Sequence, residues 1–470
     1  YELSNIFLVV MSLWFYGYFN IYYLLIIIGS MAVNYLLSYL LQFAHTKAAQ
    51  RIYLFVGVAS NLGLLFYFKY YDFFIENINT AFQTDFNLKN ILLPLGISFF
   101  TFQQLSFIID RCTGRAEHYS VVHYMMFVTF FPQLVAGPIV LHQEVIPQFK
   151  DVSKRKFNKD NFEKGIVFFV IGLGKKVLLA DALALAVNFG YEQIYFLDTP
   201  SALLVSLAYA FELYFDFSGY SDMAIGLGKM FGIDLPVNFN SPYKAYSIKN
   251  LWNRWHITLS RFLTTYVYFP LGGSRKGKVR TIMNTMVVFL LSGLWHGANW
   301  TFVIWGLIQG FFVSFDSLRL IGAKGTMEKQ PALFYIPKRI CQFFTFIIFM
   351  FSLIFFRSDS ITQAVQMFKN IFSFKETGYL LKLAGQYDLP EVYLVKQVLQ
   401  LVKPDMVSVL YLVVFILLLL ISFVMIRGKN TVEIVTANSF TNKISWLMTI
   451  IFVWSVISFS QVSTFIYFNF

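Results

Sequence analysis

The sequence predicts an all-α integral membrane protein, a bundle of many helices that cross the bilayer. The chain has 470 residues, of which 57% are hydrophobic and only 13% are charged. Soluble globular proteins average roughly 25% charged residues, so this chain lacks the charge to cover a surface that faces water. Its apolar residues also gather in blocks of about 18 residues or more. Each block is long enough to cross a hydrocarbon core of about 30 Å as a helix.

The hydrophobic segments number about 11 to 12. They cover residues 5–19, 21–43, 52–71, 90–110, 119–139, 165–189, 199–217, 281–296, 300–318, 340–356, 407–425 and 444–468. The segment 119–139 contains Pro132, Gly137 and Pro138 and is flanked by basic loops on both sides. We therefore expect it to enter the membrane and turn back. Irregular backbone at that depth requires protein or a wet cavity around it.

The net charge of +12 excludes no class by itself, but the Lys and Arg residues lie in short segments between the apolar blocks. This is the positive-inside pattern of membrane proteins, so we expect contact with membrane lipid and no nucleic-acid partner. We place the basic segments 45–51, 111–115, 150–164, 229–280, 319–339 and 427–443 in the cytoplasm. Segments 72–90, 190–198 and 357–406 are placed outside. Two cysteines, Cys112 and Cys341, form no metal-ligand spacing, and no phosphate-binding, dinucleotide or zinc motif is present.

The segment 243–270 is amphipathic. A helical wheel from Leu251 to Tyr266 puts tryptophan, leucine and phenylalanine on one face and Asn250, Asn253, Arg254 and Arg261 on the other. This pattern predicts a helix that lies along an interface or packs inside the bundle, and that does not span the membrane. His256 falls on the boundary between the two faces. A second, weaker amphipathic pattern covers 361–373.

Two of the six histidines directly follow a tryptophan, in Trp255-His256 and Trp295-His296. His296 ends an apolar run, so its imidazole is expected at the carbonyl end of a helix inside the hydrophobic thickness, where ionisable groups are costly and usually functional. Histidine exchanges protons near neutral pH, so it can deprotonate an attacking hydroxyl or become acylated itself. The alternative is an interfacial histidine that bonds a backbone carbonyl. We assign no role to the other histidines.

Glu212, Asp216 and Tyr220 recur every four residues and share one helix face. They form either a polar wall of a wet cavity, with an acid that orients the histidine, or a buried network that locks helices together. Nearby, Lys175 and Lys176 lie inside an apolar block. Snorkelling to an interface is the favoured interpretation; pairing with a carboxylate, or receipt of an anionic thioester carrier, is the alternative.

Several long motifs closely resemble the membrane-bound O-acyltransferases, and most closely the branch that O-acetylates alginate and peptidoglycan. The motifs are LPLGISFFTFQQLSFIID (93–110), FFPQLVAGPI (130–139), YFDFSGYSDMAIGLGKMFGI (214–233), NFNSPYKAYSIKNLWNRWHITLSRFL (238–263), YFPLGGSRKG (268–277), SGLWHGANWTFVIWG (292–306) and FIYFNF (465–470). The resemblance runs from about residue 90 to the end. It implies one membrane domain over residues 1–470 around a central funnel. Members usually carry a further N-terminal hydrophobic segment, so we expect the start at Tyr1 to be truncated.

The resemblance also implies site residues. His296 matches the catalytic histidine of the family, and His256 matches a second motif histidine, which is a further catalytic candidate and otherwise positions substrate or lines the channel. We expect a wet passage from the cytoplasm to reach His296, and donors near it, such as Asn299 or the amides of Gly297 and Ala298, to stabilise an oxyanion. The residues expected to line the path of the acyl donor are Asn299, Asp216, Trp255, Trp295, Tyr220 and Arg254.

The implied activity is transfer of an acetyl group from a cytoplasmic thioester to the outer side of a bacterial cytoplasmic membrane. The donor is acetyl-CoA or a phosphopantetheine carrier, with no bound cofactor and no metal. An extracytoplasmic SGNH-type transferase with a serine nucleophile would complete the modification of the polysaccharide. The alternatives are D-alanyl transfer to teichoic acid by the same fold, and a polytopic transporter or flippase. A transporter typically shows repeated halves, and none is evident.

Overall fold

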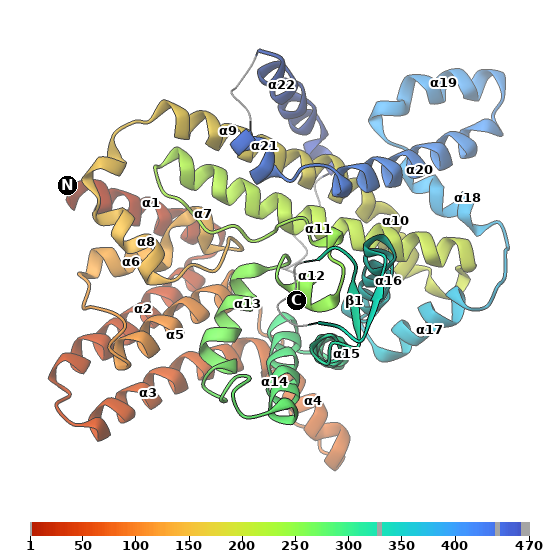
Figure 1. Cartoon of the computed structure of the whole chain (residues 1–470). Coiled ribbons are helices and arrows are strands. Elements are labelled where there is room, and N and C mark those ends of the chain that lie inside the picture. The colour runs from red at the N-terminus through yellow and green to blue at the C-terminus, as the bar shows by residue number, and fades with distance from the viewer. Residues whose placement is uncertain (1, 327–330, 438–441, 462–470) are drawn as a thin grey trace. The chain divides into compact units, whose positions relative to one another are not determined.

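The protein is almost entirely helical, as the sequence predicts. The structure, a computed structural model, describes residues 2–326, 331–437 and 442–461 (Figure 1). Five helical stretches are long and apolar enough to cross a membrane, namely Ile21–Phe43, Lys47–Phe82, Thr199–Met230, Lys338–Arg357 and Met406–Arg427. Leu3–Phe19 and Asn442–Ile457 are shorter apolar helices. The only strands in the described part of the chain are β1 (Ile321–Ala323) and β2 (Phe334–Ile336), which pair in parallel.

The described residues pack as two compact units built from interleaved stretches of chain. The first unit contains the residues up to Phe169, 221–238 and 258–270; the second contains 170–220, 239–257 and 271 onward. The single domain over 1–470 and the central funnel stay predictions. Residues 462–468 of the last predicted span, and the motif at 465–470, lie outside the described residues.

The first unit carries α1–α8 with parts of α9, α11 and α13. Its helices are α1 (Glu2–Phe19), α2 (Ile21–Leu40), α3 (Lys47–Leu65), α4 (Tyr71–Phe82), α5 (Ile97–Cys112), α6 (Val121–Thr129), α7 (Phe131–Leu134) and α8 (His142–Lys150). Buried amides join α2, α3 and α5: the Asn34 Nδ2 donates to the Asn61 Oδ1 at 3.2 Å and to the Gln104 Oε1 at 2.8 Å. Such bonds between side chains hold helices together where apolar burial alone does not discriminate partners.

Two predicted boundaries in this unit are wrong. The span predicted at 52–71 is part of one helical stretch, because α3 continues through a π-helical turn into α4 (Tyr71–Phe82). The helix continues past the predicted end at residue 71, through polar residues such as Asp72. The helix predicted from residue 90 begins only at Ile97, after Pro94 and a left-handed Gly96 (φ +69°). A Cβ at Gly96 would lie 2.7 Å from the carbonyl oxygen of Leu134, so the close approach requires glycine.

The predicted irregular segment 119–139 is irregular and buried. Helix α6 ends at Thr129, α7 makes one turn, and residues 135–141 form no helix. The broken backbone finds partners in its own unit: the Ile139 amide donates to the Thr258 Oγ1 at 3.0 Å, and the Arg261 guanidinium donates to the Ile139 carbonyl at 3.1 Å. Protein therefore surrounds the irregular backbone, as its exclusion from lipid requires. The re-entry into a membrane stays a prediction.

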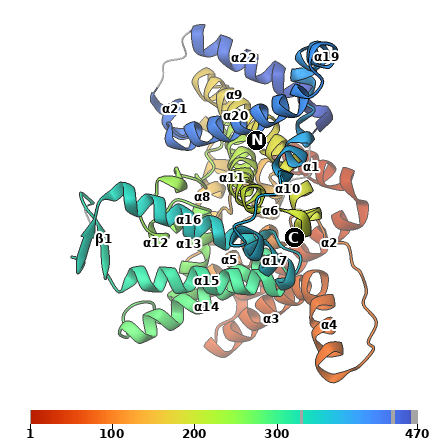
Figure 2. The same cartoon turned by 90° about the vertical axis from the view of Figure 1, so that its right-hand side faces the viewer.

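The second unit carries the remaining helices. They are α10 (Asp181–Glu192), most of α11 (Thr199–Met230), α12 (Ile248–Trp252), α14 (Lys278–His296), α15 (Trp300–Ser317), α16 (Lys338–Arg357), α17 (Ile361–Ile371), α18 (Tyr379–Ala384), α19 (Tyr393–Val402), α20 (Met406–Arg427), α21 (Thr431–Ala437) and α22 (Asn442–Ile457). The chain passes between the units inside α9 (Lys159–Gly174) and α13 (Ile257–Leu263). Figure 2 shows α14 and α15 side by side, with the strands at the end of α15.

The start of α11 is fixed by a buried carboxylate. Asp198 accepts hydrogen bonds from the amides of Ser201 (3.1 Å), Thr377 (3.0 Å) and Tyr379 (3.2 Å). Burial raises the pKa of Asp198, but these hydrogen bonds outweigh it and hold the pKa below its usual value. The carboxylate is therefore ionised at neutral pH and clamps the 377–379 loop to the first turn of α11. Helix α11 extends to Met230, well beyond the predicted end at 217.

Candidate active site

The helix α14 places His296 at its carbonyl end, as the sequence predicts. The helix ends there because Gly297 is extended (φ −163°) and Asn299 caps the following helix α15 by accepting a hydrogen bond from the Thr301 amide at 3.0 Å. A Cβ at Gly297 would lie 2.1 Å from the Phe302 ring, so only glycine fits this turn. His296 is only 2% exposed.

Glycines bring α14 and α15 into close contact. A Cβ at Gly293 would lie 2.3 Å from the Phe302 carbonyl oxygen, and a Cβ at Gly306 would lie 2.4 Å from the Phe289 carbonyl oxygen. Small residues at facing positions allow two helix backbones to approach in this way. The antiparallel pair thus fixes the end of α14, and with it the position of His296.

The backbone around His256 differs from the prediction. The single amphipathic helix expected from Leu251 to Tyr266 is wrong, because α12 stops at Trp252 and α13 begins at Ile257. Between them, the amides of Arg254 and Trp255 both donate to the Leu251 carbonyl at 2.8 Å, which closes a turn. His256 follows in the left-handed conformation (φ +43°) and is fully buried. The periodicity could not show this break, since apolar residues on either side of it are buried by different neighbours.

The two motif histidines lie close together in the second unit. Their ring centroids are 6.4 Å apart, and the Trp295 ring lies 5.7 Å from His256 and 5.0 Å from His296. Residues 40 positions apart in the sequence therefore share one site. Phe217 of α11 packs edge-on against His256 at 4.7 Å. The motif resemblance named both histidines, and the structure brings them together.

Aromatic rings enclose His296. Trp305 of α15 lies 5.2 Å from it and Phe356 of α16 lies 5.1 Å from it, and these two rings contact each other at 4.9 Å. His296 is only 2% exposed, so these rings form most of its immediate surroundings. The wet passage expected to reach His296 stays a prediction. The sequence offered no signal for Phe356, which lies 60 residues from the histidine at the end of another span.

Asp216 pairs with a lysine. The Lys176 ammonium lies 2.8 Å from the Asp216 carboxylate and 2.7 Å from the Asp181 carboxylate, and all three residues are buried. Snorkelling was therefore the wrong choice for Lys176, and pairing with carboxylates is the correct one. The neighbouring Lys175 is also buried, and its ammonium donates to the Thr431 Oγ1 at 2.9 Å. The buried network that locks helices together is the interpretation that the structure supports.

The remaining predicted lining residues have structural partners. The Asn299 amide donates to the Asp359 carbonyl at 2.8 Å while its oxygen caps α15, so both ends of this side chain hold the fold. The Gly297 amide donates to the Gly293 carbonyl at 3.3 Å. Arg254 is half-buried and donates to the Asn250 Oδ1 and the Asn240 carbonyl, both at 3.1 Å. These bonds compete with any oxyanion for the same donors.

Trp255 and Tyr220 differ in their burial. Trp255 is 2% exposed and packs against Phe239 (5.1 Å) and Phe349 (5.3 Å), so it belongs to the aromatic core beside His256. Tyr220 is half-buried at the end of its stretch of α11 in this unit. Among the described residues, no group of three or more His, Cys, Asp or Glu side chains is placed to hold a metal ion, and we assign no metal ligand.

Comparison with known proteins identifies the class. The profile of the MBOAT, membrane-bound O-acyltransferase family, matches residues 7–365. A peptidoglycan O-acetyltransferase of Helicobacter pylori is 40% identical over 392 residues, which cover 78% of this chain and 73% of the relative. The probable alginate O-acetylase AlgI of Pseudomonas aeruginosa is 38% identical over 381 residues, covering 79% and 70%. A teichoic acid D-alanyltransferase of Bacillus subtilis is 28% identical over 233 residues, covering 48% and 59%. The chain belongs to the membrane-bound O-acyltransferase family and is an acyltransferase embedded in a membrane.

Proposed function

We propose that this enzyme transfers an acetyl group from a cytoplasmic thioester for the O-acetylation of a cell-surface polysaccharide, peptidoglycan or an alginate-like polymer. The observation that carries the proposal is that the two motif histidines are both buried and that the centroids of their rings lie 6.4 Å apart, among aromatic side chains. Relatives named as O-acetylating enzymes match most of the chain at 38–40% identity, whereas the D-alanyltransferase relative matches 48% of it at 28% identity. Acetyl is therefore favoured over D-alanyl transfer. The bacterial relatives favour the cytoplasmic membrane of a bacterium.

In the proposed reaction, His296 acts as the general base and His256 positions the substrate. The imidazole of His296 takes the proton of the attacking hydroxyl as the new C–O bond forms on the acetyl carbon. The C–S bond of the thioester then breaks, and the same proton passes to the leaving thiolate. The products are an O-acetyl ester and a free thiol. Such general-base catalysis typically contributes about 10²–10⁴-fold to the rate.

A separate extracytoplasmic transferase of the SGNH type would finish the modification. The described segment placed outside, 357–406, forms short helices such as α17, α18 and α19 (Figure 1), which do not make a folded transferase domain. A donor of coenzyme A or phosphopantetheine type would arrive from the basic, cytoplasmic side. The partner transferase is expected from the family resemblance, and the side from which the donor arrives follows from the orientation given by the basic loops.

The test is acetyl transfer in proteoliposomes that contain the purified enzyme together with the SGNH-type transferase, with radiolabelled acetyl-CoA and a glycan oligomer as acceptor. We expect His296→Ala to lower the rate by about 10²–10⁴-fold. The matched control is His45→Ala, which removes an exposed histidine and keeps full activity. A fully active and folded His296→Ala variant would contradict the role of His296. Faster transfer from a D-alanyl carrier thioester than from acetyl-CoA would assign the alternative reaction. If radiolabelled acetyl groups were found covalently attached to the protein during turnover, the mechanism would proceed through an acyl-imidazole, and His296 would not act as a general base.

A further inference from the structure

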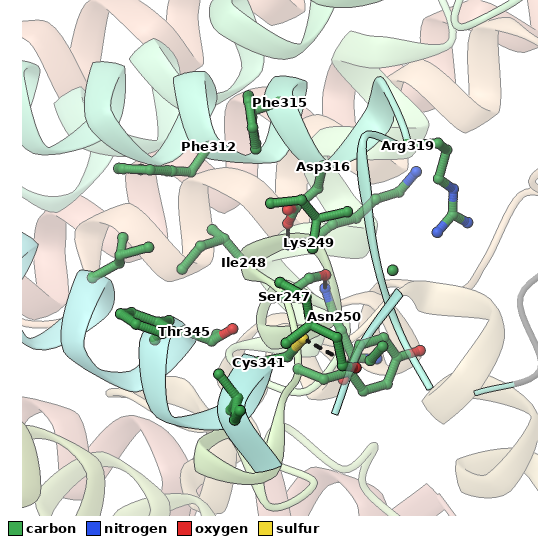
Figure 3. Close-up of a pocket in the computed structure, with 18 of the residues that line it drawn as sticks. Ser247, Ile248, Lys249, Asn250, Phe312, Phe315, Asp316, Arg319, Cys341 and Thr345 are labelled. Carbon is green, nitrogen blue, oxygen red and sulfur yellow. Dashed lines mark hydrogen bonds between the residues drawn. The ribbon is translucent and has the colours of Figure 1, made fainter. Parts of the chain in front are cut away.

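A pocket of about 590 Å³ lies in the second unit (Figure 3). Its walls come from the segment 246–253, the last turns of α15, the two short strands and the first half of α16. These segments border the basic loops that we place in the cytoplasm, 229–280 and 319–339. Neither the proposed reaction nor the family resemblance assigns a role to this pocket.

One side of the pocket is apolar and open. Phe312 of α15 and Ile340, Phe344 and Ile348 of α16 line it. Ile340 is 44% exposed and Phe344 is 57% exposed. Helix α16 is one of the helices long and apolar enough to cross a membrane. Apolar side chains exposed at the end of such a helix face the acyl chains of lipid, so this wall is suited to hydrocarbon.

The other side of the pocket is polar and carries positive charge. In Figure 3, Arg319 lies opposite Phe312 and Thr345. Lys249 is exposed, and Arg319 is half-buried in a left-handed conformation (φ +60°) just after α15. The carboxylate of Asp316 accepts a hydrogen bond from the Lys249 backbone amide at 2.8 Å, which ties it to the start of α12. The pocket is therefore lined by two cationic side chains and one carboxylate, and the carboxylate is bonded to the backbone at the start of α12.

We propose that this pocket binds an anionic phospholipid of the cytoplasmic leaflet. Its phosphate would lie against Lys249 and Arg319, and an acyl chain would follow the exposed face of α16 past Phe344. A soluble phosphate would use the cations alone and gain nothing from the apolar wall. The basic residues Lys324, Lys338 and Arg339 flank the lining in sequence. They add to the attraction of a negatively charged leaflet, roughly fivefold in affinity for each cation near the surface.

The pocket is linked to the histidine site through two tryptophans. Trp252, at the end of α12, donates a hydrogen bond to the Gln309 Oε1 at 3.1 Å, and its ring lies 5.8 Å from Trp305. Trp305 lies 5.2 Å from His296. A lipid that holds α12 against α15 and α16 would therefore support the enclosure of His296. This regulatory consequence rests on the proposed function, whereas the binding itself does not.

The test is the binding of dioleoylphosphatidylglycerol to the full-length protein in detergent, measured by native mass spectrometry and by the midpoint of thermal unfolding. We expect this lipid to be retained and to raise the midpoint, and dioleoylphosphatidylcholine to do neither. The double variant K249Q/R319Q should bind the anionic lipid about 25-fold more weakly. The matched control R275Q/K276Q removes one exposed arginine and one exposed lysine of the same unit and should bind normally.

Two further experiments distinguish a lipid phosphate from a soluble phosphate. The variant Phe344→Gln keeps every charge, and we expect it to weaken binding of the lipid and to leave binding of glycerol 3-phosphate unchanged. Coenzyme A at the same phosphate concentration should not displace the lipid. Equal retention of the two lipids by the native protein, or equal losses in K249Q/R319Q and the control, would overturn the proposal. Displacement by coenzyme A would assign the pocket to the acyl donor instead. Acetyl transfer measured in the same preparations tests the proposed function separately.

Discussion

His256 combines a fully buried imidazole with a backbone conformation that residues with a Cβ rarely adopt. Its φ of +43° places it in the left-handed region, which costs roughly 1 kcal/mol for a residue other than glycine. The surrounding contacts maintain this conformation: the turn closed on Leu251 precedes it, and the rings of Phe217 and Trp295 pack on its side chain. Strained residues of this kind concentrate at functional sites. The strain therefore agrees with a role in the reaction.

The strain can be separated from the chemistry by comparing two substitutions. His256→Gly and His256→Ala both remove the imidazole, but only glycine adopts a positive φ without a steric penalty. We expect the glycine variant to be more stable by about 1 kcal/mol. The measurement is the midpoint of thermal unfolding in the same detergent, with His45→Ala as the reference for loss of an exposed imidazole. An alanine variant as stable as the glycine variant would show that the backbone at this position is not strained.

Single residues show where prediction from the sequence succeeds. The motifs identified His256 and His296, and the apolar run before His296 correctly placed it at a helix end. The partner of Lys176 could not be predicted, because Asp216 is 40 positions away and several acids were available. Asn299, the predicted donor to an oxyanion, caps α15 through its side-chain oxygen. The sequence could not show this cap, because it depends on the neighbouring backbone, and the role toward an oxyanion stays a prediction.

At the scale of elements, the contact between α14 and α15 controls the position of His296. The Gly306→Ala substitution places a methyl group 2.4 Å from the Phe289 carbonyl oxygen. Backbone atoms cannot move out of the way as a flexible side chain can, so the two helices must separate. Overpacking of this kind costs about 1–3 kcal/mol. We expect lower thermal stability and a lower rate of acyl transfer, because the end of α14 shifts with the helix.

The control for this substitution is Gly63→Ala in α3, where a new Cβ would meet no atom within 4 Å. Alanine is the better helix former by about 1 kcal/mol, so this variant should be as stable as the native protein or more so. The two variants make the same chemical change in two helices. If Gly306→Ala were as stable and active as Gly63→Ala, the close contact of α14 and α15 would not be needed to hold the site.

Helices were predicted well where hydrophobicity alone decides, as in α2, α16 and α20. The predictions failed where a helix is polar on one side or where tertiary contacts break it. Helix α4 continues beyond the predicted end of the span at residue 71, and the break before His256 is not visible in the sequence because both flanking turns are apolar. Sequence periodicity reports which residues are buried. It does not report whether one neighbour or several bury them.

At the scale of the whole molecule, the two compact units draw on alternating stretches of chain. The chain passes from one unit to the other inside α9, α11 and α13 and also in the non-helical segments after residues 238 and 270, and no composition change or repeat marks these boundaries. Local patterns carry no information about such interleaving. The second unit nevertheless gathers all of the predicted site residues, because the motifs that contain them meet around α14 and α15.

The orientation of the chain in the membrane can be tested on one long helix of the first unit. Lys47–Phe82 is helical over 36 residues, which at 1.5 Å per residue spans about 54 Å and exceeds a hydrocarbon core of about 30 Å. If this helix crosses the membrane, its ends lie on opposite sides. The positive-inside rule puts the end with Lys47 and Arg51 in the cytoplasm and the end near Asp85 outside.

Single cysteines at the two ends report this orientation directly. In a variant with Cys112 and Cys341 replaced by serine, we expect Asp85→Cys to react with a membrane-impermeant maleimide in intact cells. Lys47→Cys should react only after the membrane is opened. Both original positions are exposed, so burial does not limit either reaction. Labelling of Lys47→Cys alone in intact cells would show that the chain has the opposite orientation. The basic loops, with the phospholipid pocket beside them, would then lie on the outer side. Labelling of both in intact cells would mean that the helix lies along the surface, because one apolar helix cannot present both ends to the same solution while crossing the bilayer.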